Sequence, residues 1–216
     1  MSHCQCEGIE RRFDTERVTN EVNQYRLHGM AKTTRLLVEA LQAQGVDNMS
    51  LLDIGGGVGA IAHALLQAGA RQATDVDAST AYLAAAREEA SRRGLEGRMS
   101  FQYGDFVALA PALSATDVVT LDRVICCYDD MPALVKRSAA LAQQFYGVVY
   151  PRDIWWFRLF TWARSLIRRI KHEPMRFFVY PTAAVDATIR AQGLEERFHQ
   201  TSGPWRIVVY ARTSSH

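Results

Sequence analysis

The chain has 216 residues, enough for one domain with a sizeable core, because typical domains contain roughly 100 to 200 residues. Its composition, 48% hydrophobic and 22% charged with 14 Gly and 6 Pro, excludes disordered, collagen-like and disulfide-scaffold proteins. The 25 Lys and Arg nearly balance the 23 Asp and Glu, and the resulting charge of +2 gives no indication of a nucleic-acid partner.

The N-terminal residues 1–13 lack the apolar core of a secretory signal, so we expect a cytoplasmic protein. The most apolar stretch, residues 154–170, is interrupted by four arginines, and no segment predicts a membrane span. The cysteines form two close pairs, Cys4-Gln5-Cys6 and Cys126-Cys127, a spacing that suits thiols better than a disulfide framework. No other cluster has metal-ligand spacing, and we expect no metal site.

The first 46 residues predict a helical preface. Residues 11–27 are polar with helical spacing, Gly29 interrupts the pattern, and residues 32–44 carry apolar side chains three and four positions apart. A helix before the first strand is expected to find no free face of the sheet, so we expect the preface to cover the top of the ligand cleft as a lid.

From residue 47 onward, strands and helices alternate. Strands are predicted at residues 50–54, 72–76, 99–103, 117–121 and 145–150, and helices at residues 61–68, 79–93, 131–143 and 182–192. Residues 194–199 and 205–211, separated by Ser202-Gly203-Pro204, predict a C-terminal antiparallel hairpin. The pattern predicts an α/β fold over residues 47–216: a Rossmann-like, doubly wound sheet of about seven strands, with a helical insertion over residues 152–180 after the fifth strand.

A glycine-rich turn follows the first strand, in Asp53-Ile54-Gly55-Gly56-Gly57-Val58-Gly59. Residues without a Cβ between a buried strand and a helix let a nucleotide-like ligand approach the backbone closely. With Ala60, the turn also satisfies a dinucleotide fingerprint, so the glycines alone do not exclude NAD. A carboxylate at Asp53 would repel a pyrophosphate but attract the sulfonium and amino groups of S-adenosylmethionine, which favours the latter cofactor.

These motifs resemble the class I S-adenosylmethionine-dependent methyltransferases, from about residue 32 to the C-terminus. The resemblance implies that Asp77, at the end of the second strand, binds both ribose hydroxyls, and that Asp105 in Gly104-Asp105-Phe106 binds the adenine amino group. An N-cap role is the alternative for Asp105. The cofactor-binding residues that follow from the resemblance are Asp53, Gly55, Gly57, Gly59, Asp77, Ala78, Asp105, Phe106 and Leu121.

The acceptor side is expected after the fourth strand, in Asp122 to Tyr128, because open α/β sheets bind ligands at the carboxyl ends of their strands. The segment lacks the Asn/Asp-Pro-Pro-Tyr pattern of enzymes that methylate nucleobase amines or glutamine amides, which excludes those substrates. Candidate catalytic residues are Asp122, Tyr128 and His28, and candidate substrate-binding residues are Tyr25, Cys127, Arg152, Trp155 and Trp156. The cysteines could equally be small buried fillers.

The downstream half is similar to magnesium-protoporphyrin IX O-methyltransferases, through Leu121-Asp122, Pro151-Arg152 and a following aromatic, basic segment. Residues 154–170 predict a basic amphipathic helix that suits a carboxylated amphipathic substrate or peripheral contact with an anionic membrane. A lid with solvated arginines is the alternative.

The leading hypothesis is methyl transfer from S-adenosylmethionine to a small, anionic and partly apolar molecule. The alternatives are thiol-assisted methylation of a soft metalloid such as trivalent arsenic, a NAD-type enzyme on the same fold, and a non-catalytic membrane-surface protein. The pattern leaves the oligomeric state open.

Overall fold

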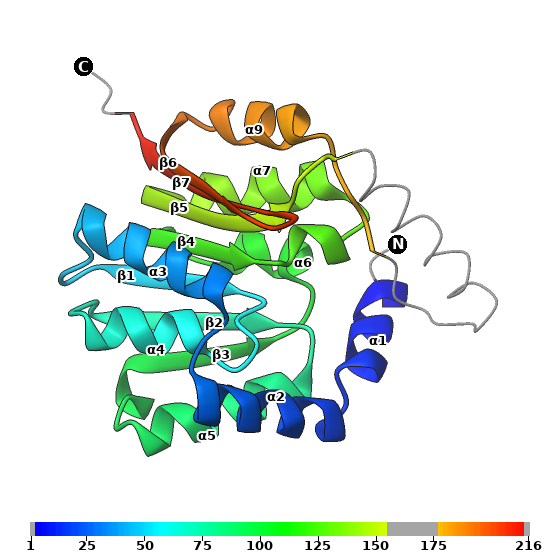
Figure 1. The fold of residues 1–216 in the computed structure, drawn as a ribbon, viewed down its shortest axis with the longest axis vertical. Coiled ribbons are helices and arrows are strands. Elements are labelled where there is room, and N and C mark those ends of the chain that lie inside the picture. Colours follow the sequence, from blue (N-terminus) through cyan, green and yellow to red (C-terminus); the bar gives the residue numbers. More distant parts are fainter. Residues whose placement is uncertain (1–2, 155–176, 214–216) are drawn as a thin grey trace.

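The computed structural model describes residues 3–154 and 177–213. Within them, seven strands form one sheet in the order β3-β2-β1-β4-β5-β7-β6 (Figure 1). Strands β1 to β5 run parallel, and the C-terminal hairpin is antiparallel to them, with β7 paired to β5 and β6 at the edge. The strands are β1 (Ser50–Ile54), β2 (Gln72–Asp77), β3 (Met99–Tyr103), β4 (Thr116–Asp122), β5 (Ala142–Pro151), β6 (Leu194–Ser202) and β7 (Trp205–Arg212).

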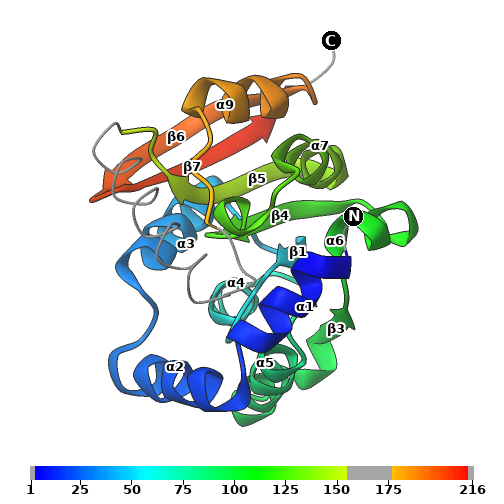
Figure 2. The ribbon, with the colours of Figure 1, turned by 90° about the vertical axis from the view of Figure 1, so that its right-hand side faces the viewer.

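Helices cover both faces of the sheet, as the alternating pattern predicted. Alternate residues of each central strand face opposite sides, so that Leu52 belongs to a core with α7 and α9, whereas Leu51 belongs to a core with α3 and α4. Figure 2 shows α9 beside α7 on their shared face. The helices are α1 (His3–Arg12), α2 (Thr15–His28), α3 (Lys32–Gln44), α4 (Ala60–Gln67), α5 (Thr80–Arg92), α6 (Phe106–Leu109), α7 (Met131–Leu141) and α9 (Thr182–Arg190).

Helix α3 departs from the expectation that the whole preface covers the cleft. It packs on the sheet against β5 and β7, and Leu37 and Leu41 are fully buried there. A Cβ on Gly147 of β5 would lie 3.0 Å from Leu37 Cδ1, so the missing side chain lets the helix approach the strand closely. The expectation was wrong because the antiparallel hairpin widens the sheet and leaves a face beside α4 for α3 to cover.

The polar part of the preface consists of two helices rather than one. Asp14 separates them: its side chain accepts a hydrogen bond from Arg17 N at 2.9 Å and caps α2. Helix α2 packs on α5, and α1 lies apart from α3, α4, α7 and α9 on the right-hand side of Figure 1. Of the three described helices of the preface, α1 and α2 are therefore placed to cover a ligand, while α3 reaches the cavity through Thr34 in its first turn.

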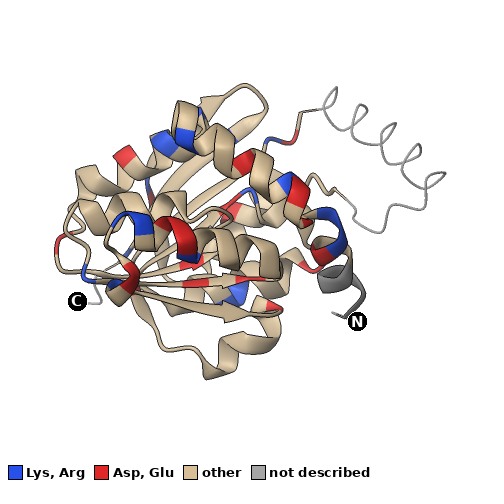
Figure 3. Cartoon of the chain, turned by 90° about the horizontal axis from the view of Figure 1, so that it is seen from below, with Lys and Arg blue, Asp and Glu red and all other residues tan. Residues whose placement is uncertain are grey.

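Charged residues are distributed without a strong bias of sign. In the view of Figure 3, acidic and basic residues are intermingled on the described helices. Among the helices in residues 3–154 and 177–213, none combines the length and the apolar character that a bilayer span requires. The basic segment 154–170 lies outside the described residues, apart from Ile154.

Candidate active site

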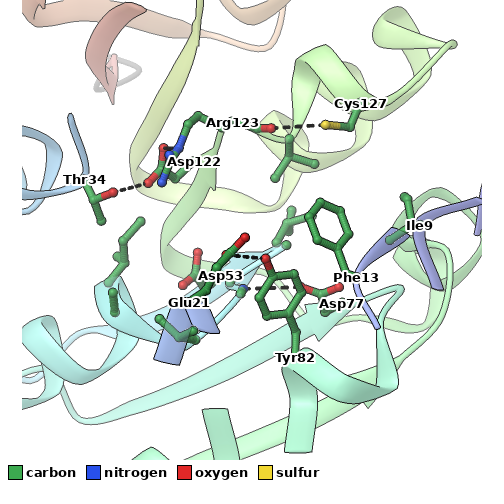
Figure 4. Close-up of a pocket in the computed structure, with 18 of the residues that line it drawn as sticks. Ile9, Phe13, Glu21, Thr34, Asp53, Asp77, Tyr82, Asp122, Arg123 and Cys127 are labelled. Carbon is green, nitrogen blue, oxygen red and sulfur yellow. Dashed lines mark hydrogen bonds and ion pairs between the residues drawn. The ribbon is translucent and has the colours of Figure 1, made fainter. Parts of the chain in front are cut away.

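A cavity of about 870 Å³ lies at the carboxyl ends of β1, β2 and β4 (Figure 4). Its floor is the glycine-rich turn, one wall is the segment after β4, and the opposite wall comes from α1 and α2. The volume falls in the range typical of small-molecule sites, roughly 300 to 1,000 Å³. The fold thus places the first two helices beside the cleft that was expected from the sequence.

The glycine-rich turn exposes its backbone to the cavity. Gly55 and Gly57 adopt positive φ angles of 66° and 59°, which side chains disfavour. A Cβ on Gly55 would lie 2.6 Å from Val124 Cγ2, and one on Gly56 would lie 2.7 Å from Asp75 Oδ1. A ligand can therefore contact the main chain of the turn directly, because no side chain could be accommodated there without rearrangement.

Two buried carboxylates lie beneath this turn on adjacent strands. Asp53 and Asp75 are in register across β1 and β2, and each has an Oδ2 atom without a hydrogen-bond partner in the described structure. Asp53 Oδ1 accepts a hydrogen bond from Thr120 Oγ1 at 2.7 Å, and Asp75 Oδ1 accepts a longer one from Gly56 N at 3.3 Å. Burial, reinforced by the neighbouring carboxylates, raises the pKa of Asp53 to about 7 and that of Asp75 well above its usual value.

Asp77 completes the acidic floor at the end of β2. Its Oδ1 accepts from Ser79 N at 2.9 Å and its Oδ2 from Gly57 N at 3.3 Å, which fixes the carboxylate beside the turn. Burial raises its pKa to about 6 despite these hydrogen bonds. A cationic ligand would stabilise the ionised form of these carboxylates, whereas a pyrophosphate would add like charge. The floor therefore fits a sulfonium and ammonium compound better than a dinucleotide.

The position of Asp105 allows both roles considered for it, capping a helix and binding a ligand. Its Oδ1 caps α6 by accepting from Val107 N at 3.0 Å and also accepts from Tyr128 Oη at 2.8 Å. Its Oδ2 is buried without a partner in the described structure. The carboxylate thus combines N-capping with an acceptor atom available to a ligand, next to Phe106 on the cavity wall.

Hydrogen bonds and ring contacts connect α1, α2 and Phe13 between them to α5, beside the glycine-rich turn. Tyr82 Oη donates to Glu21 Oε2 at 2.5 Å, and the Tyr82 ring packs against Phe13 with centroids 5.0 Å apart (Figure 4). The Glu10 carboxylate of α1 accepts from Thr80 N at 2.9 Å, at the first turn of α5. These contacts connect α1 and α2, which cover the cavity, to α5, the helix that follows Asp77. The covering helices are therefore attached to the elements that form the cavity floor.

The acceptor end of the cavity surrounds Asp122. Its Oδ2 accepts from Thr34 Oγ1 at 2.5 Å, and its Oδ1 accepts from Arg123 Nε at 3.2 Å (Figure 4). The Arg123 guanidinium also lies over the Trp205 ring, 6.0 Å from its centroid. Arg123 adopts a positive φ of 61°, a strained conformation for a residue other than glycine.

Most of the residues proposed from the sequence line this cavity. They are Tyr25, His28, Asp53, Gly55, Gly57, Asp77, Ala78, Asp105, Phe106, Asp122, Cys127 and Tyr128. Three others do not: Gly59 lies against His63 at the start of α4, Leu121 is fully buried in the core, and Arg152 follows the end of β5. Trp155 and Trp156 lie outside the described residues.

Several cavity residues gave no signal in the sequence. Glu21 and Tyr82 meet only because α2 packs on α5, and Trp205 reaches the cavity from the hairpin turn. Thr34 looks like an ordinary residue in the first turn of α3. Arg123 stood within the segment assigned to the acceptor side, but its backbone strain is invisible in sequence.

Part of the chain matches a known protein family. Residues 51–145, somewhat less than half of the chain, match the protein family described as Methyltransferase domain. No curated protein matches the chain.

Solved structures of low sequence identity share the fold. Magnesium protoporphyrin IX methyltransferase from Synechocystis PCC 6803, solved with bound SAH, has a TM-score of 0.70 at 20% identity, covering 84% of this chain and 83% of that one. An O-methyltransferase family protein from Burkholderia thailandensis has a TM-score of 0.71 at 18% identity, covering 95% and 62%. An O-methyltransferase family 2 protein from Planctomyces limnophilus, in complex with apigenin, has a TM-score of 0.61 at 16% identity, covering 86% and 63%.

Residues 51–145 thus match a methyltransferase domain, and the seven-stranded sheet has the fold of the solved methyltransferases.

Proposed function

We propose that the cavity binds S-adenosylmethionine over the glycine-rich turn and transfers its methyl group to a small, anionic and partly apolar molecule beside Asp122. The observation that carries this proposal is the acidic floor. Asp53 and Asp77 line the cavity, and burial raises the pKa of both. A ligand with a sulfonium and an ammonium group relieves this cost of ionisation, because opposite charges attract strongly in a partly dry cleft.

The cofactor-binding roles follow from the donors and acceptors that are available. Asp77 is held by two backbone N–H groups and keeps lone pairs on both oxygens for the two ribose hydroxyls. Asp105 Oδ2, which has no partner in the described structure, suits the adenine amino group. Phe13 and Phe106 also line the cavity and would supply apolar contact for the base.

The acceptor roles follow from the arrangement around Asp122. Methyl transfer from a sulfonium is an in-line displacement, so the protein must chiefly align the acceptor and, for a protonated acceptor, remove its proton. Asp122 is the carboxylate best placed to accept that proton, and Arg123 provides a cation for an anionic group. The hydroxyl of Tyr128 donates to Asp105, which favours a positioning role for Tyr128.

His28 and Tyr25 line the cavity from α2 and would contact the acceptor from the side of the cover. Arg152, Trp155 and Trp156 remain proposed substrate contacts. Trp205 lines the cavity and would supply apolar surface for the acceptor, which supports the proposal of a partly apolar molecule.

Calorimetry with S-adenosylhomocysteine and, separately, with NAD tests the cofactor. We expect micromolar binding of the former and none of the latter. The variant Asp77→Ala should weaken S-adenosylhomocysteine binding by about 1 to 3 kcal/mol, the value of charged hydrogen bonds. Asp47→Ala, which removes an exposed carboxylate before β1, is the matched control and should bind like the wild type. Absence of S-adenosylhomocysteine binding, or tighter binding of NAD, would contradict the proposal.

A screen of carboxylated aromatic acceptors tests the other half of the cavity. Arg123→Gln should raise KM for anionic acceptors and leave KM for S-adenosylmethionine unchanged, because the guanidinium lies at the acceptor end. Equal effects on anionic and neutral acceptors would show that Arg123 does not select by charge.

A further inference from the structure

The two adjacent cysteines of the acceptor wall converge on one point. Cys126 and Cys127 lie in a short 3₁₀ turn, Ile125–Cys127, and their sulfur atoms are 3.7 Å apart. Both thiols lie within hydrogen-bonding distance of the Arg123 carbonyl oxygen, at 3.1 Å for Cys126 and 3.6 Å for Cys127 (Figure 4 draws the latter). Adjacent side chains on a strand would point to opposite faces, so the turn is what brings the two sulfurs together.

The separation of the sulfurs matches chelation rather than a covalent bond between them. A disulfide has sulfur atoms about 2.05 Å apart. Two thiolates bound to one soft centre at about 2.3 Å, with an angle of about 100 to 110°, lie roughly 3.5 to 3.8 Å apart. The observed 3.7 Å falls within this range.

The two cysteines face the cavity on one side, and on the other side their turn is held by a hydrogen bond. Both cysteines line the cavity, Cys126 being buried and Cys127 half-buried. The main chain of Cys126 accepts a hydrogen bond from Phe178 N at 2.8 Å, which fixes the turn from behind. The positive φ of Arg123 orients the carbonyl that both thiols approach, and such strain is typical of functional sites.

We infer that Cys126 and Cys127 form a chelating dithiol site for a soft trivalent metalloid, presented as a neutral hydroxide such as arsenous acid. The condensation is balanced without a redox step: two S–H groups and two of the three As–OH groups give two As–S bonds and two molecules of water. One hydroxide stays on the arsenic, which remains trivalent.

The number of ligands favours a neutral hydroxide over a bare metal cation: among the described residues no group of three His, Cys, Asp or Glu side chains could hold a metal ion, whereas the metalloid needs only the two sulfurs. A cation would have to expel both protons to solvent, whereas a hydroxide removes each as water. Arsenous acid is neither anionic nor apolar, so this site goes beyond the proposed function and does not name the acceptor of the proposed methyl transfer.

Retention of arsenic by the whole chain tests the site. Reduced protein is incubated with sodium arsenite, passed through a desalting column and assayed for arsenic and for titratable thiols. We expect about one arsenic per chain, with two thiols protected, and at least tenfold less retained by Cys126→Ser/Cys127→Ser. Arsenate, which is pentavalent and anionic, should not be retained. Thermal melting shows whether the variant is folded, and Cys126→Ala/Cys127→Ala provides a second, more conservative variant for a buried site.

The other cysteine pair supplies the decisive comparison. Cys4 and Cys6 belong to α1, whose residues Ile9 and Arg12 line the same cavity. Retention unchanged in Cys126→Ser/Cys127→Ser but lost in Cys4→Ser/Cys6→Ser would overturn the inference, as would a wild type that retains no arsenic. Loss in both double variants would support it and add sulfur ligands from α1. Arsenic retention without S-adenosylhomocysteine binding would refute the proposed function and leave the dithiol site standing.

Discussion

The substitution Asp75→Asn tests whether the buried acidic pair beneath the glycine-rich turn holds a proton. Asp75 is fully buried, has one unpartnered oxygen and lies in register with Asp53. Asparagine has nearly the same shape, keeps an acceptor for Gly56 N and adds a donor toward Asp53. Because Asp75 does not line the cavity, the substitution acts on stability without removing a ligand contact.

The magnitude follows from proton linkage. Burial, then the charges of Asp53 and Asp77, raise the folded-state pKa of Asp75 well above its usual value, whereas the unfolded chain ionises near about 3.9. Above that pH the folded state holds one more proton than the unfolded state, so wild-type stability falls by up to about 1.4 kcal/mol per pH unit until the folded-state pKa is passed. Asp75→Asn lacks this contribution. Its stability relative to wild type should therefore increase with pH above about pH 5, by up to about 1.4 kcal/mol per pH unit.

Urea unfolding followed by circular dichroism at several pH values measures this difference. The matched control is Asp117→Asn. Burial opposes ionisation of Asp117, but hydrogen bonds from Ser50 and Gln144 outweigh it and lower its pKa. Its stabilising effect is lost only as pH falls through that lowered pKa, so the control should be less stable than wild type by a constant amount over the same range. Parallel curves for wild type and Asp75→Asn would refute the reasoning that Asp75 is protonated.

Three further substitutions test the floor and the cover. Gly56→Ala should lower the free energy of unfolding by about 1 to 3 kcal/mol in urea titrations, because its Cβ would lie within 3.0 Å of two carboxylate oxygens; wild-type stability would contradict this. Tyr82→Phe removes the donor to Glu21 and should weaken S-adenosylhomocysteine binding by about 1 kcal/mol in calorimetry, while an unchanged affinity would mean that α2 does not close over the ligand. Glu89→Gln weakens the buried acceptor that lies 2.7 Å from Arg26 Nε, and it should lower the melting temperature. It should also speed proteolysis within α2. Cleavage rates equal to those of the wild type would show that the Arg26–Glu89 contact does not hold α2 on α5.

The parts of the molecule that are encoded locally could be predicted from the sequence. The apolar run 50–54, the glycines after it and the caps of the following helices act within a few residues, and the elements from β1 to β7 appear in the predicted order. Asp53 and Asp77 lie in the last two residues of β1 and β2, and Asp105 lies two residues after β3; the resemblance to class I methyltransferases pointed to Asp77 and Asp105. The antiparallel hairpin was also predictable, because both strands and the turn between them are contiguous in the chain.

The rest depended on contacts between residues far apart in the chain. The position of α3 was decided by the width of the sheet and by Gly147, neither of which is visible from residues 32–44. The pairing of Asp53 with Asp75 comes from the register of β1 and β2, and the contact between Glu21 and Tyr82 comes from helix packing.

Sequence alone therefore determined the order of the elements, the glycine-rich turn and the carboxylates at the strand ends. Only the tertiary structure decided which carboxylates share a buried space, which helices cover the cavity and that the sulfurs of Cys126 and Cys127 converge. The physical reason is that hydrophobic periodicity and glycine conformation act over a few residues, whereas burial, charge and strand register act between segments that meet only in the folded chain.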